Sequence, residues 1–342
     1  MNFNSVQVIT KSFAQIQRGG NNPRFEIEII DPPKPAEHEL QVENAYVAQN
    51  PTDVQSFDNN AFGDGAVLGC DFVGRVKKVG KKVSRHRSGD VIAGLIWGGE
   101  VKGLGAYADY TIANDYYDTL GMLHILGALF SKDCLAIDRK SGKQTSVLIW
   151  GGSSSVGLYA IQLARLHKFN VVTVCSPKHH NYVKDLGAHH VFDYKSDDVV
   201  DNVKEVAPRL QYIFDTIGDK TSSAIASHAL GEAGGTLCTV RPGKANREGV
   251  SSQTKITDVL VWTAFLKDHQ YKDFKWPGNK ADHELAAELF KKLPNWLEDG
   301  TIKPNKTRVL RPLGEKLPEG FQEYRDGKIS GYKIVYNFRR ER

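Results

Sequence analysis

The amino-acid sequence predicts an α/β protein built from two parts, an antiparallel barrel-like β domain and a doubly wound parallel sheet. Two features of the pattern support this prediction. Up to about residue 113, short runs of alternating apolar and polar residues are separated by glycine, and from Val147 onward strand-like runs alternate with helix-like runs. The chain has 342 residues, of which 40% are hydrophobic and 25% charged, which suits two domains of ordinary size.

The first part contains the short runs expected of an antiparallel β domain. They cover residues 25–30, 39–47, 71–80, 90–96 and 106–113. Strands of this length and spacing, with turn residues between them, are typical of barrel-like β domains. A strand-like run at 332–338 closes the chain, and we expect residues 291–342 to complete the domain formed by residues 1–113.

The second part, residues 114–290, alternates strands with helices. Strand-like runs occupy residues 147–150, 171–175, 190–194, 212–218 and 235–240, and helix-like runs occupy 156–169, 179–188, 198–207 and 222–231. This alternation requires a mainly parallel sheet with helices on both faces. An amphipathic helix is expected at 284–300.

The composition argues against several classes of partner. The chain carries 45 basic and 40 acidic residues, a net charge of +5, and the basic residues are scattered, so no nucleic-acid partner is expected. No run of about 18 apolar residues predicts a membrane span, and the N-terminal residues lack the apolar segment of a secretory signal. The four cysteines (Cys70, Cys134, Cys175 and Cys238) form no CxxC pair. We therefore expect a reducing, cytoplasmic setting and no structural zinc.

The stretch GGSSSVG, which begins at Gly151, predicts a phosphate-binding turn. Gly151 and Gly152 follow an apolar strand and make the turn, and Val156 and Gly157 open a helix. The free amides and positive dipole end of a helix N-terminus suit a pyrophosphate. Gly157 permits close packing of helix on strand, and Ser153, Ser154 and Ser155 add hydroxyl donors. The strand–turn–helix context favours dinucleotide binding over a purely structural turn.

The end of the second strand of this region predicts which dinucleotide binds. An NAD site places an acidic residue there, which bonds the ribose 2′-hydroxyl. This chain instead has Ser176, Pro177, Lys178 and His179, and Tyr194 ends the next strand. A hydroxyl and an ammonium favour a 2′-phosphate, so NADPH is the expected cofactor. The alternative is that Lys178 is an ordinary surface lysine.

Further cofactor contacts are expected where other strands end. Thr216 ends the fourth strand, Val240 and Arg241 follow the next, and Ile334 and Val335 lie on the closing strand. The carboxyl ends of parallel strands face the ligand crevice of such sheets. The histidine pairs at 179–180 and 189–190 are expected to be surface or strand-edge residues rather than metal ligands.

The chain resembles the medium-chain dehydrogenase/reductase superfamily in motifs spread over nearly its whole length: NPTD from Asn50, GCDFVGRVKKVG from Gly69, GAYADY from Gly105, GGSSSVG and SGYKIV from Ser330. More narrowly, SPKHH, FDY and IKPNKTRVL are similar to fungal zinc-free members, the trans-acting enoyl reductases and the yeast zinc-type alcohol dehydrogenase-like proteins. The resemblance implies a GroES-like β-barrel substrate domain, a Rossmann domain and an active site in the cleft between them.

The same resemblance implies roles for residues near Asn50. Thr52, Asp53, Val54 and Gln55 would lie at the nicotinamide ribose and phosphates, with Asn50, Thr52 and Gln55 on the catalytic side. Relatives often carry a lysine at the position of Gln55. The composition of Asn-Pro-Thr-Asp is equally that of a simple turn.

The positions of the zinc ligands also differ from those of zinc-dependent relatives. Such relatives have a cysteine at the position of Asn50 and a His-Glu pair at the positions of Cys70 and Asp71. Zinc requires thiolate and imidazole ligands in a tetrahedral arrangement, so no metal is expected. Without a Lewis acid, hydride transfer from NADPH to an activated double bond of an α,β-unsaturated carbonyl or a quinone is the favoured reaction.

Two alternatives remain open, a metal-free carbonyl reductase and a dinucleotide-binding protein without turnover. The segment between GAYADY and Val147 is shorter than in relatives, which predicts an altered pocket or reduced activity, and His124 within it is expected to be a packed residue. A polyketide synthase as partner is left open, as is the choice between monomer and homodimer, for which the strand-like run from Val259 is the relevant segment.

Overall fold

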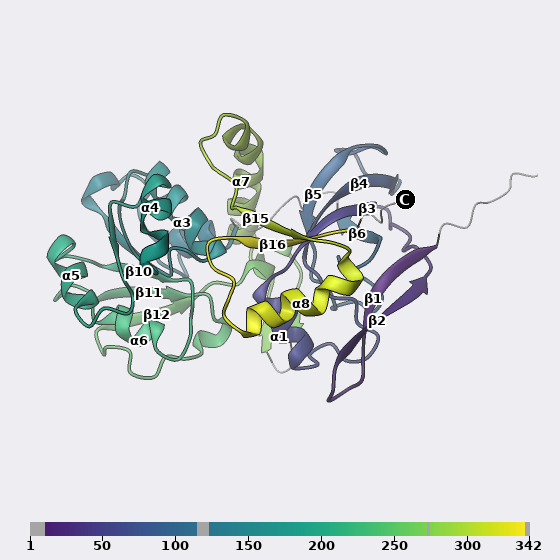
Figure 1. Ribbon diagram of the computed structural model, residues 1–342. Coiled ribbons are helices and arrows are strands. Elements are labelled where there is room, and N and C mark those ends of the chain that lie inside the picture. The colour runs from purple at the N-terminus through teal and green to yellow at the C-terminus, as the bar shows by residue number, and fades with distance from the viewer. Residues whose placement is uncertain (1–10, 115–122, 272–273, 339–342) are drawn as a thin grey trace, which may run out of the picture. The chain divides into compact units, whose positions relative to one another are not determined.

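The computed structural model describes residues 11–114, 123–271 and 274–338 (Figure 1). The chain divides into two compact units. Unit 1 comprises residues 1–119, 307–329 and 333–342, and unit 2 comprises residues 120–306 and 330–332. The boundary expected at residue 290 falls inside the helix α7 (Lys280–Glu298), which belongs entirely to unit 2.

Unit 1 contains a mixed sheet with the strand order β15-β16-β3-β4-β5, and β6 also pairs with β3. Only the pairing of β15 with β16 is parallel. A separate antiparallel pair, β1 and β2, is joined to the rest by single bridges from Ala14 to Ala108 and from Ile16 to Val67. The strands are β1 (Ser12–Arg18), β2 (Arg24–Ile30), β3 (Glu39–Ala48), β4 (Asp71–Val79), β5 (Val91–Leu95), β6 (Tyr110–Asn114), β15 (Thr307–Leu310) and β16 (Lys333–Asn337).

Two helices of unit 1 were not expected from the sequence, α1 (Pro51–Asp58) and α8 (Leu313–Arg325). The stretch Asn-Pro-Thr-Asp, whose composition also fits a turn, starts α1. Proline is favoured at the first helical position because its missing N–H would have no partner there. The Asp53 carboxylate accepts a hydrogen bond from the backbone N–H of Asn50 at 2.7 Å, as an acidic residue at the third helical position does in a capping box.

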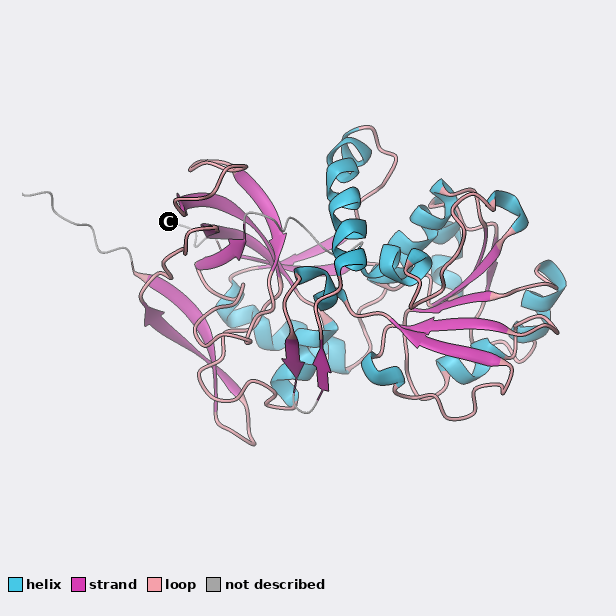
Figure 2. Ribbon diagram, turned by 180° about the vertical axis from the view of Figure 1, so that it is seen from behind, coloured by secondary structure: helices cyan, strands magenta, loops and turns pink. Residues whose placement is uncertain are grey.

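Unit 2 has a parallel sheet with the strand order β12-β11-β10-β7-β8-β9. Numbered along the chain, this is the order 6-5-4-1-2-3 of a dinucleotide-binding Rossmann sheet, which confirms the predicted fold. Figure 2 shows helices on both sides of the sheet. The strands are β7 (Ser146–Trp150), β8 (Asn170–Val174), β9 (His190–Phe192), β10 (Tyr212–Asp215), β11 (Gly235–Thr239) and β12 (Thr254–Asp258), and the helices are α2 (Leu123–Phe130), α3 (Ser155–Leu166), α4 (His180–Asp185), α5 (Val199–Val206), α6 (Ser222–Ser227) and α7.

The strand-like run from Val259 differs from its sequence pattern. It forms a 3₁₀ helix, η4 (Val261–Phe265), and is followed by the short antiparallel pair β13 (His269–Tyr271) and β14 (Phe274–Trp276). The Thr263 hydroxyl oxygen lies 2.8 Å from the carbonyl oxygen of Leu260, within the turn. A short apolar run does not distinguish a buried strand from a buried helical segment.

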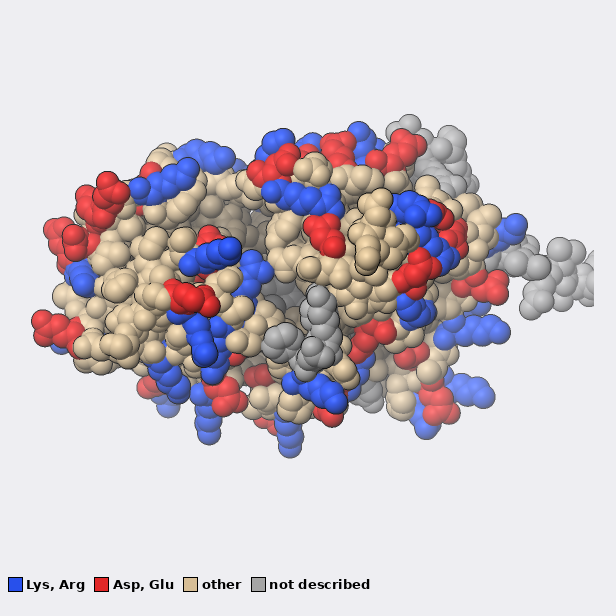
Figure 3. All heavy atoms as spheres, turned by 90° about the horizontal axis from the view of Figure 1, so that it is seen from below, with Lys and Arg blue, Asp and Glu red and all other residues tan. Residues whose placement is uncertain are grey.

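The surface carries both signs of charge. On the face shown in Figure 3, the lysine and arginine side chains are interspersed with aspartate and glutamate. Among the described residues, no helix is long and apolar enough to cross a membrane.

Candidate functional site

The glycine turn of unit 2 leaves no room for side chains at three positions. Gly151 has φ of 86°, in the left-handed region that glycine adopts readily. A Cβ atom added to Gly152 would lie 2.2 Å from the Thr173 hydroxyl oxygen, and one added to Gly157 would lie 2.3 Å from the carbonyl oxygen of Gly151. The turn therefore depends on glycine for both its conformation and its close packing on the sheet.

The helix α3 begins directly after this turn. Ser154 is its N-cap, and its hydroxyl oxygen accepts a hydrogen bond from the N–H of Gly157 at 2.9 Å. Within the described part of the chain, no hydrogen bond uses the N–H groups of Ser155 and Val156. These two amides lie at the positive end of the helix dipole, where the sequence predicts that an anion binds. The hydroxyl of Ser154 thus caps the helix, and its own O–H remains a hydrogen-bond donor.

Thr216 holds the turn in place. Its hydroxyl lies within hydrogen-bonding distance of the carbonyl oxygens of Trp150 and Gly151, at 2.8 and 3.0 Å, and of the Ser154 hydroxyl at 2.8 Å. Thr216 is buried. Its side chain therefore positions the glycine turn and the cap of α3, where the sequence suggested a direct cofactor contact.

The residues after β8 form a basic cluster around His179. The His179 Nε2 atom is 2.8 Å from the Ser330 hydroxyl. Burial, followed by the charges of Lys178 and Lys306, lowers the pKa of His179. The Lys306 ammonium lies 4.5 Å from the ring centroid of Tyr182. Ser176 is half-buried beside this cluster and Lys178 is exposed. Two lysines, a serine hydroxyl and an imidazole are suitable ligands for a phosphate.

The other predicted cofactor contacts of unit 2 are more dispersed. Tyr194 lies two residues beyond the end of β9, is 41% exposed, and has the Lys195 ammonium 5.7 Å from its ring centroid. The Arg241 Nε donates to the carbonyl of Gly218 at 2.9 Å, and Val240 is half-buried after β11. Pro177 begins the 3₁₀ turn η2 (Pro177–His179).

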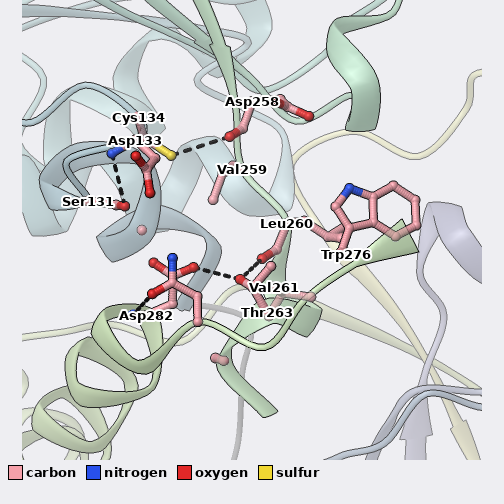
Figure 4. Close-up of a pocket in the computed structure, with 13 residues that line it drawn as sticks. Ser131, Asp133, Cys134, Asp258, Val259, Leu260, Val261, Thr263, Trp276 and Asp282 are labelled. Atoms are coloured by element: carbon pink, nitrogen blue, oxygen red, sulfur yellow. Dashed lines mark hydrogen bonds between the residues drawn. The ribbon is translucent and has the colours of Figure 1, made fainter. Parts of the chain in front are cut away.

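A pocket of about 200 Å³ opens at the carboxyl end of β12, between α2, η4 and the start of α7 (Figure 4). The Cys134 thiol donates to the carbonyl of Asp258 at 3.3 Å, and the Thr263 hydroxyl donates to the Asp282 carboxylate at 2.6 Å. Strands β12 and β7 are three places apart in the sheet, which corresponds to about 14 Å. The pocket and the glycine turn thus lie on the same edge of one parallel sheet.

In unit 1, the predicted residues 52–55 lie in the helix α1, and their side chains point either into the unit or toward its surface. The side chains of Asp53 and Val54 are buried in the unit, at 2% and 0% exposure, whereas Thr52 and Gln55 are half-buried. The Gln55 amide donates to the Tyr324 hydroxyl at 2.8 Å. Of the four residues from 52 to 55, only Thr52 and Gln55 therefore present part of their side chains at the surface of the unit.

Asp53 is the centre of a buried hydrogen-bond network. One carboxylate oxygen accepts from the N–H of Asn50 and from the Tyr107 hydroxyl, at 2.7 and 3.2 Å, and the other accepts from the Cys70 thiol at 3.4 Å. Burial raises the pKa of Asp53 to about 6, against the lowering effect of the Asn50 N–H. Burial and the charge of Asp53 also raise the pKa of Cys70 well above its ordinary value.

Asn50 and Asp71 lie together with Lys333, the first residue of β16. The Asn50 amide donates to the Asp71 carboxylate at 2.8 Å, and the Lys333 ammonium donates to the Asn50 amide oxygen and lies 3.5 Å from the same carboxylate. We call these three residues the Asn50 cluster. A catalytic zinc ion is held by three thiolate, imidazole or carboxylate ligands of the protein. In the Asn50 cluster only the Asp71 carboxylate is of this kind, since neither the Asn50 amide nor the Lys333 ammonium is a usual zinc ligand.

The histidine pairs and the closing strand complete the predicted set. Among the described residues, no three or more His, Cys, Asp or Glu side chains are placed to hold a metal ion. Ile334 is buried, at 1% exposure, so its side chain faces the interior of unit 1, and Val335 is half-buried. The side chain of His124 and residues 115–122, which belong to the shortened segment, lie outside the described part of the chain.

Four residues around these sites were missed by the sequence analysis. Ser330 and Lys306 lie far along the chain from His179, and Gly331 donates its N–H to the carbonyl of Ser153 at 3.1 Å. Lys333 joins Asn50 across 283 residues. The motifs SGYKIV and IKPNKTRVL contain these residues, but no local periodicity or spacing indicates which distant side chains they meet.

The comparisons with known proteins cover both units. The alcohol dehydrogenase GroES-like domain family matches residues 36–120, and the zinc-binding dehydrogenase family matches residues 155–258. A trans-enoyl reductase of Pyricularia grisea is 31% identical over 92% of this chain and 91% of its own length. A trans-enoyl reductase of Alternaria alternata is 29% identical over 96% of this chain and 99% of its own.

The fold has the same kind of relatives. The structure of the quinone oxidoreductase from Coxiella burnetii aligns with a TM-score of 0.70 at 19% identity, over 96% of this chain and 100% of that chain. This structural match shows that the two chains share a fold. The relatives in sequence align over nearly the whole of this chain, so they include both the glycine turn and the β domain. The chain belongs to the medium-chain dehydrogenase/reductase superfamily, whose enoyl reductases and alcohol dehydrogenase-like members use a nicotinamide dinucleotide.

Proposed function

We propose that the protein is a zinc-independent, NADPH-dependent reductase of a carbon–carbon double bond conjugated to a carbonyl group. The observation that carries the NADPH assignment is the basic cluster formed by Lys178, His179 and Lys306 with Ser330 after β8, where an NAD site would have an acidic residue. The trans-enoyl reductases among its relatives support the choice of an enoyl substrate.

The residues of unit 2 fit such a dinucleotide. The N–H groups of Ser155 and Val156, which no hydrogen bond uses within the described residues, would hold the pyrophosphate, because they lie at the positive end of α3. Lys178 and Lys306 would balance the charge of the 2′-phosphate. When bound, the nicotinamide supplies the hydride for the β-carbon of the substrate.

The residues of unit 1 fit the substrate side of the reaction. Thr52 and Gln55 offer a hydroxyl and an amide at the surface of α1, and Asn50 is fixed by its bond to Asp71. These side chains act by donating and accepting hydrogen bonds, and none of them is a Lewis acid. They would orient a carbonyl oxygen, and such orientation is the main contribution that a protein makes when the cofactor carries the chemistry.

The direct test is to follow the nicotinamide absorbance of NADPH while enoyl thioesters, small enones and quinones are added to the purified protein. We expect oxidation of NADPH with at least one α,β-unsaturated carbonyl compound, and much slower oxidation of NADH. Oxidation with saturated ketones or aldehydes alone would instead support the carbonyl reductase.

A protein that binds the dinucleotide without turnover is the second candidate. The observation that favours it is the bond from the Gln55 amide to the Tyr324 hydroxyl, which uses one of the two N–H donors at a position where relatives often carry a lysine. Tight NADPH binding without oxidation by any enone or quinone would support this candidate.

A further inference from the structure

Another cavity of unit 2 lies away from the glycine turn. It has a volume of about 450 Å³ and is lined by the last residues of α3 and α4 and by residues 301 and 303. Each helix leads into the start of the next strand, β8 or β9, so the cavity lies at the amino edge of the parallel sheet. The glycine turn follows β7 at the carboxyl edge, about 16 Å away along a strand of five residues.

The lining of this cavity is strongly basic. It includes the side chains of Arg165, Lys168, Lys184 and Lys303, with Asp185 as the acidic residue among them. Within the described part of the chain, none of the four basic side chains forms a hydrogen bond or an ion pair. We call this cavity the amino-edge groove. It has an excess of three positive charges, which would attract an anion.

The two helices that border the groove end in the same hydrogen-bond pattern but with different residues. After α4, Gly187 has φ of 117°, and its N–H donates to the carbonyl of Lys184 at 2.9 Å. After α3, Lys168 takes the equivalent place, with φ of 61° and an N–H that donates to the carbonyl of Arg165 at 2.8 Å. Glycine is favoured at this position, because a Cβ atom raises the energy of left-handed backbone. The helix end therefore does not explain a lysine there.

Two other basic residues of the groove are held in place by packing. Gln162 is buried, and its side-chain amide donates to the carbonyl of Lys303 at 3.1 Å and accepts from the N–H of Lys303 at 2.7 Å. The stem of Arg165 lies against Gly187, where an added Cβ would be 2.1 Å from the Arg165 Cδ. Because these parts are already ordered, a ligand would bind with a smaller loss of entropy.

Helix ends alone do not account for the positive charge of the groove. Cations are favoured at the last turn of a helix because the dipole is negative there. This explains Arg165 and Lys184, which lie in the last turns of α3 and α4. It does not explain Lys303, which lies outside the helices, or Lys168, where the backbone favours glycine.

We propose that the amino-edge groove binds a small molecule that carries two phosphate groups. Two phosphate groups bring about three to four negative charges, which matches the excess charge of the groove. Lysine and arginine donate charge-assisted hydrogen bonds to phosphate oxygens. The volume of the groove is that of a small-molecule site rather than of a flat protein interface. The site is separate from the glycine turn and does not depend on the proposed function.

The experiment is isothermal titration calorimetry with inorganic pyrophosphate, in protein already saturated with NADPH so that the glycine turn is occupied. We expect pyrophosphate to bind at least tenfold more tightly than inorganic phosphate. Lys168→Gly and Lys303→Met should each raise the Kd for pyrophosphate about tenfold, because each removes one charge-assisted donor. The Kd for NADPH should not change, since the groove lies at the other edge of the sheet. Absence of pyrophosphate binding would overturn the proposal, and so would equal affinity for phosphate.

The variant Lys168→Gly also separates binding from folding. Because glycine relieves the left-handed backbone, we expect its Tm to lie about 2 °C above that of the wild type although it binds pyrophosphate more weakly. The matched control is Lys204→Met, which removes an exposed lysine from the last turn of α5, outside the groove, and should leave the Kd for pyrophosphate unchanged. A Kd in Lys168→Gly and Lys303→Met equal to that of the wild type would contradict the proposal.

Two further outcomes identify other sites or ligands. If NADPH does not bind, the proposed function fails, and the groove is then tested with pyrophosphate alone in Lys168→Gly and Gly157→Ala. Loss of affinity in Lys168→Gly only would support the groove, whereas loss in Gly157→Ala only would assign the anion to the glycine turn and overturn the proposal. Tighter binding of an oligoglutamate peptide than of pyrophosphate would also overturn it, in favour of a docking surface for an acidic protein.

Discussion

The glycine turn of unit 2 and the Asn50 cluster of unit 1 are built in opposite ways. The turn is encoded by seven consecutive residues, Gly151 to Gly157, whose strand, turn and helix can each be recognised in the sequence. The Asn50 cluster joins three residues from distant parts of the chain, and its central cation, Lys333, has no local signature. A turn made of consecutive residues can be recognised from the sequence, whereas a cluster of residues from distant parts of the chain depends on the complete fold.

The largest expected effect on cofactor binding follows from filling the glycine turn. In Gly157→Ala the new Cβ would lie 2.3 Å from the carbonyl oxygen of Gly151, a backbone atom that cannot move without distorting the turn. We expect NADPH to bind about 100-fold more weakly, a loss of about 2.8 kcal/mol. Fluorescence titration with NADPH measures this. Gly142→Ala is the control, because a Cβ there meets nothing within 4 Å although φ is 57°.

If Gly157→Ala bound NADPH as tightly as the wild type, the turn would not be the dinucleotide site. The glycine turn could then no longer be compared with the Asn50 cluster as a locally encoded binding site.

The second prediction concerns the buried support of the Asn50 cluster. Burial raises the pKa of Asp53 to about 6 in the folded protein, above its value in the unfolded chain. The folded state therefore binds the proton more tightly, and this contribution to stability is complete below the unfolded pKa and is lost as pH rises through about 6. The loss is about 3 kcal/mol.

Urea unfolding of the wild type and of Asp53→Asn at roughly pH 4 and pH 8 measures this contribution, because other groups that titrate cancel in the difference. We expect the free energy of unfolding of the wild type to fall with pH relative to that of Asp53→Asn. A parallel dependence in the two proteins would show that the three donors around Asp53 keep its pKa near the ordinary value.

The third prediction concerns the basic cluster after β8, which combines a residue of the local motif with a distant one. Lys178 belongs to the sequence motif after β8, whereas Lys306 reaches the same cluster from elsewhere. We expect Lys178→Ala and Lys306→Ala each to weaken NADPH binding about tenfold, with little effect on NADH, because each removes a charge from the 2′-phosphate. The control is Lys184→Ala, on the exposed side of α4. Equal losses for NADPH and NADH would contradict the assignment.

The smallest expected effect concerns the cap of α3. Ser154→Ala removes the acceptor of the Gly157 N–H and one partner of Thr216. We expect a loss of about 1 kcal/mol in the free energy of unfolding. Ser155→Ala, one residue later and not the cap, should change it much less. Thermal unfolding of both variants distinguishes them, and an equal loss would mean that the cap contributes nothing specific.

The sequence could predict the features that depend on short-range patterns. The alternation from Val147 onward indicated the Rossmann sheet, and the apolar runs of the first part indicated β3, β4 and β5. The strand β1, its pairing with β2, the helices α1 and α8 and the strand β12 were missed. At α1 the composition of Asn-Pro-Thr-Asp fits both a turn and a helix start, and the capping bond of Asp53 decides between them.

The same distinction between short-range patterns and long-range packing applies to the residues of the candidate site. The roles of Gly151, Gly152 and Gly157 follow from steric rules that apply to any strand–turn–helix. The inward direction of Asp53, Val54 and Ile334 depends on how α1 and β16 pack, which no spacing of residues indicates. For the same reason the sequence did not indicate that the hydroxyls of Ser154 and Thr216 form hydrogen bonds within the protein.

The measurement that tests the central claim most directly uses NADPH deuterated at the transferable position of the nicotinamide. The product of an enoyl thioester is then examined by NMR. The account predicts one deuterium at the β-carbon of the saturated product. Deuterium at the carbonyl carbon would establish a carbonyl reductase, and no transfer despite tight NADPH binding would establish a dinucleotide-binding protein. Either result would contradict the proposed reduction of a conjugated double bond.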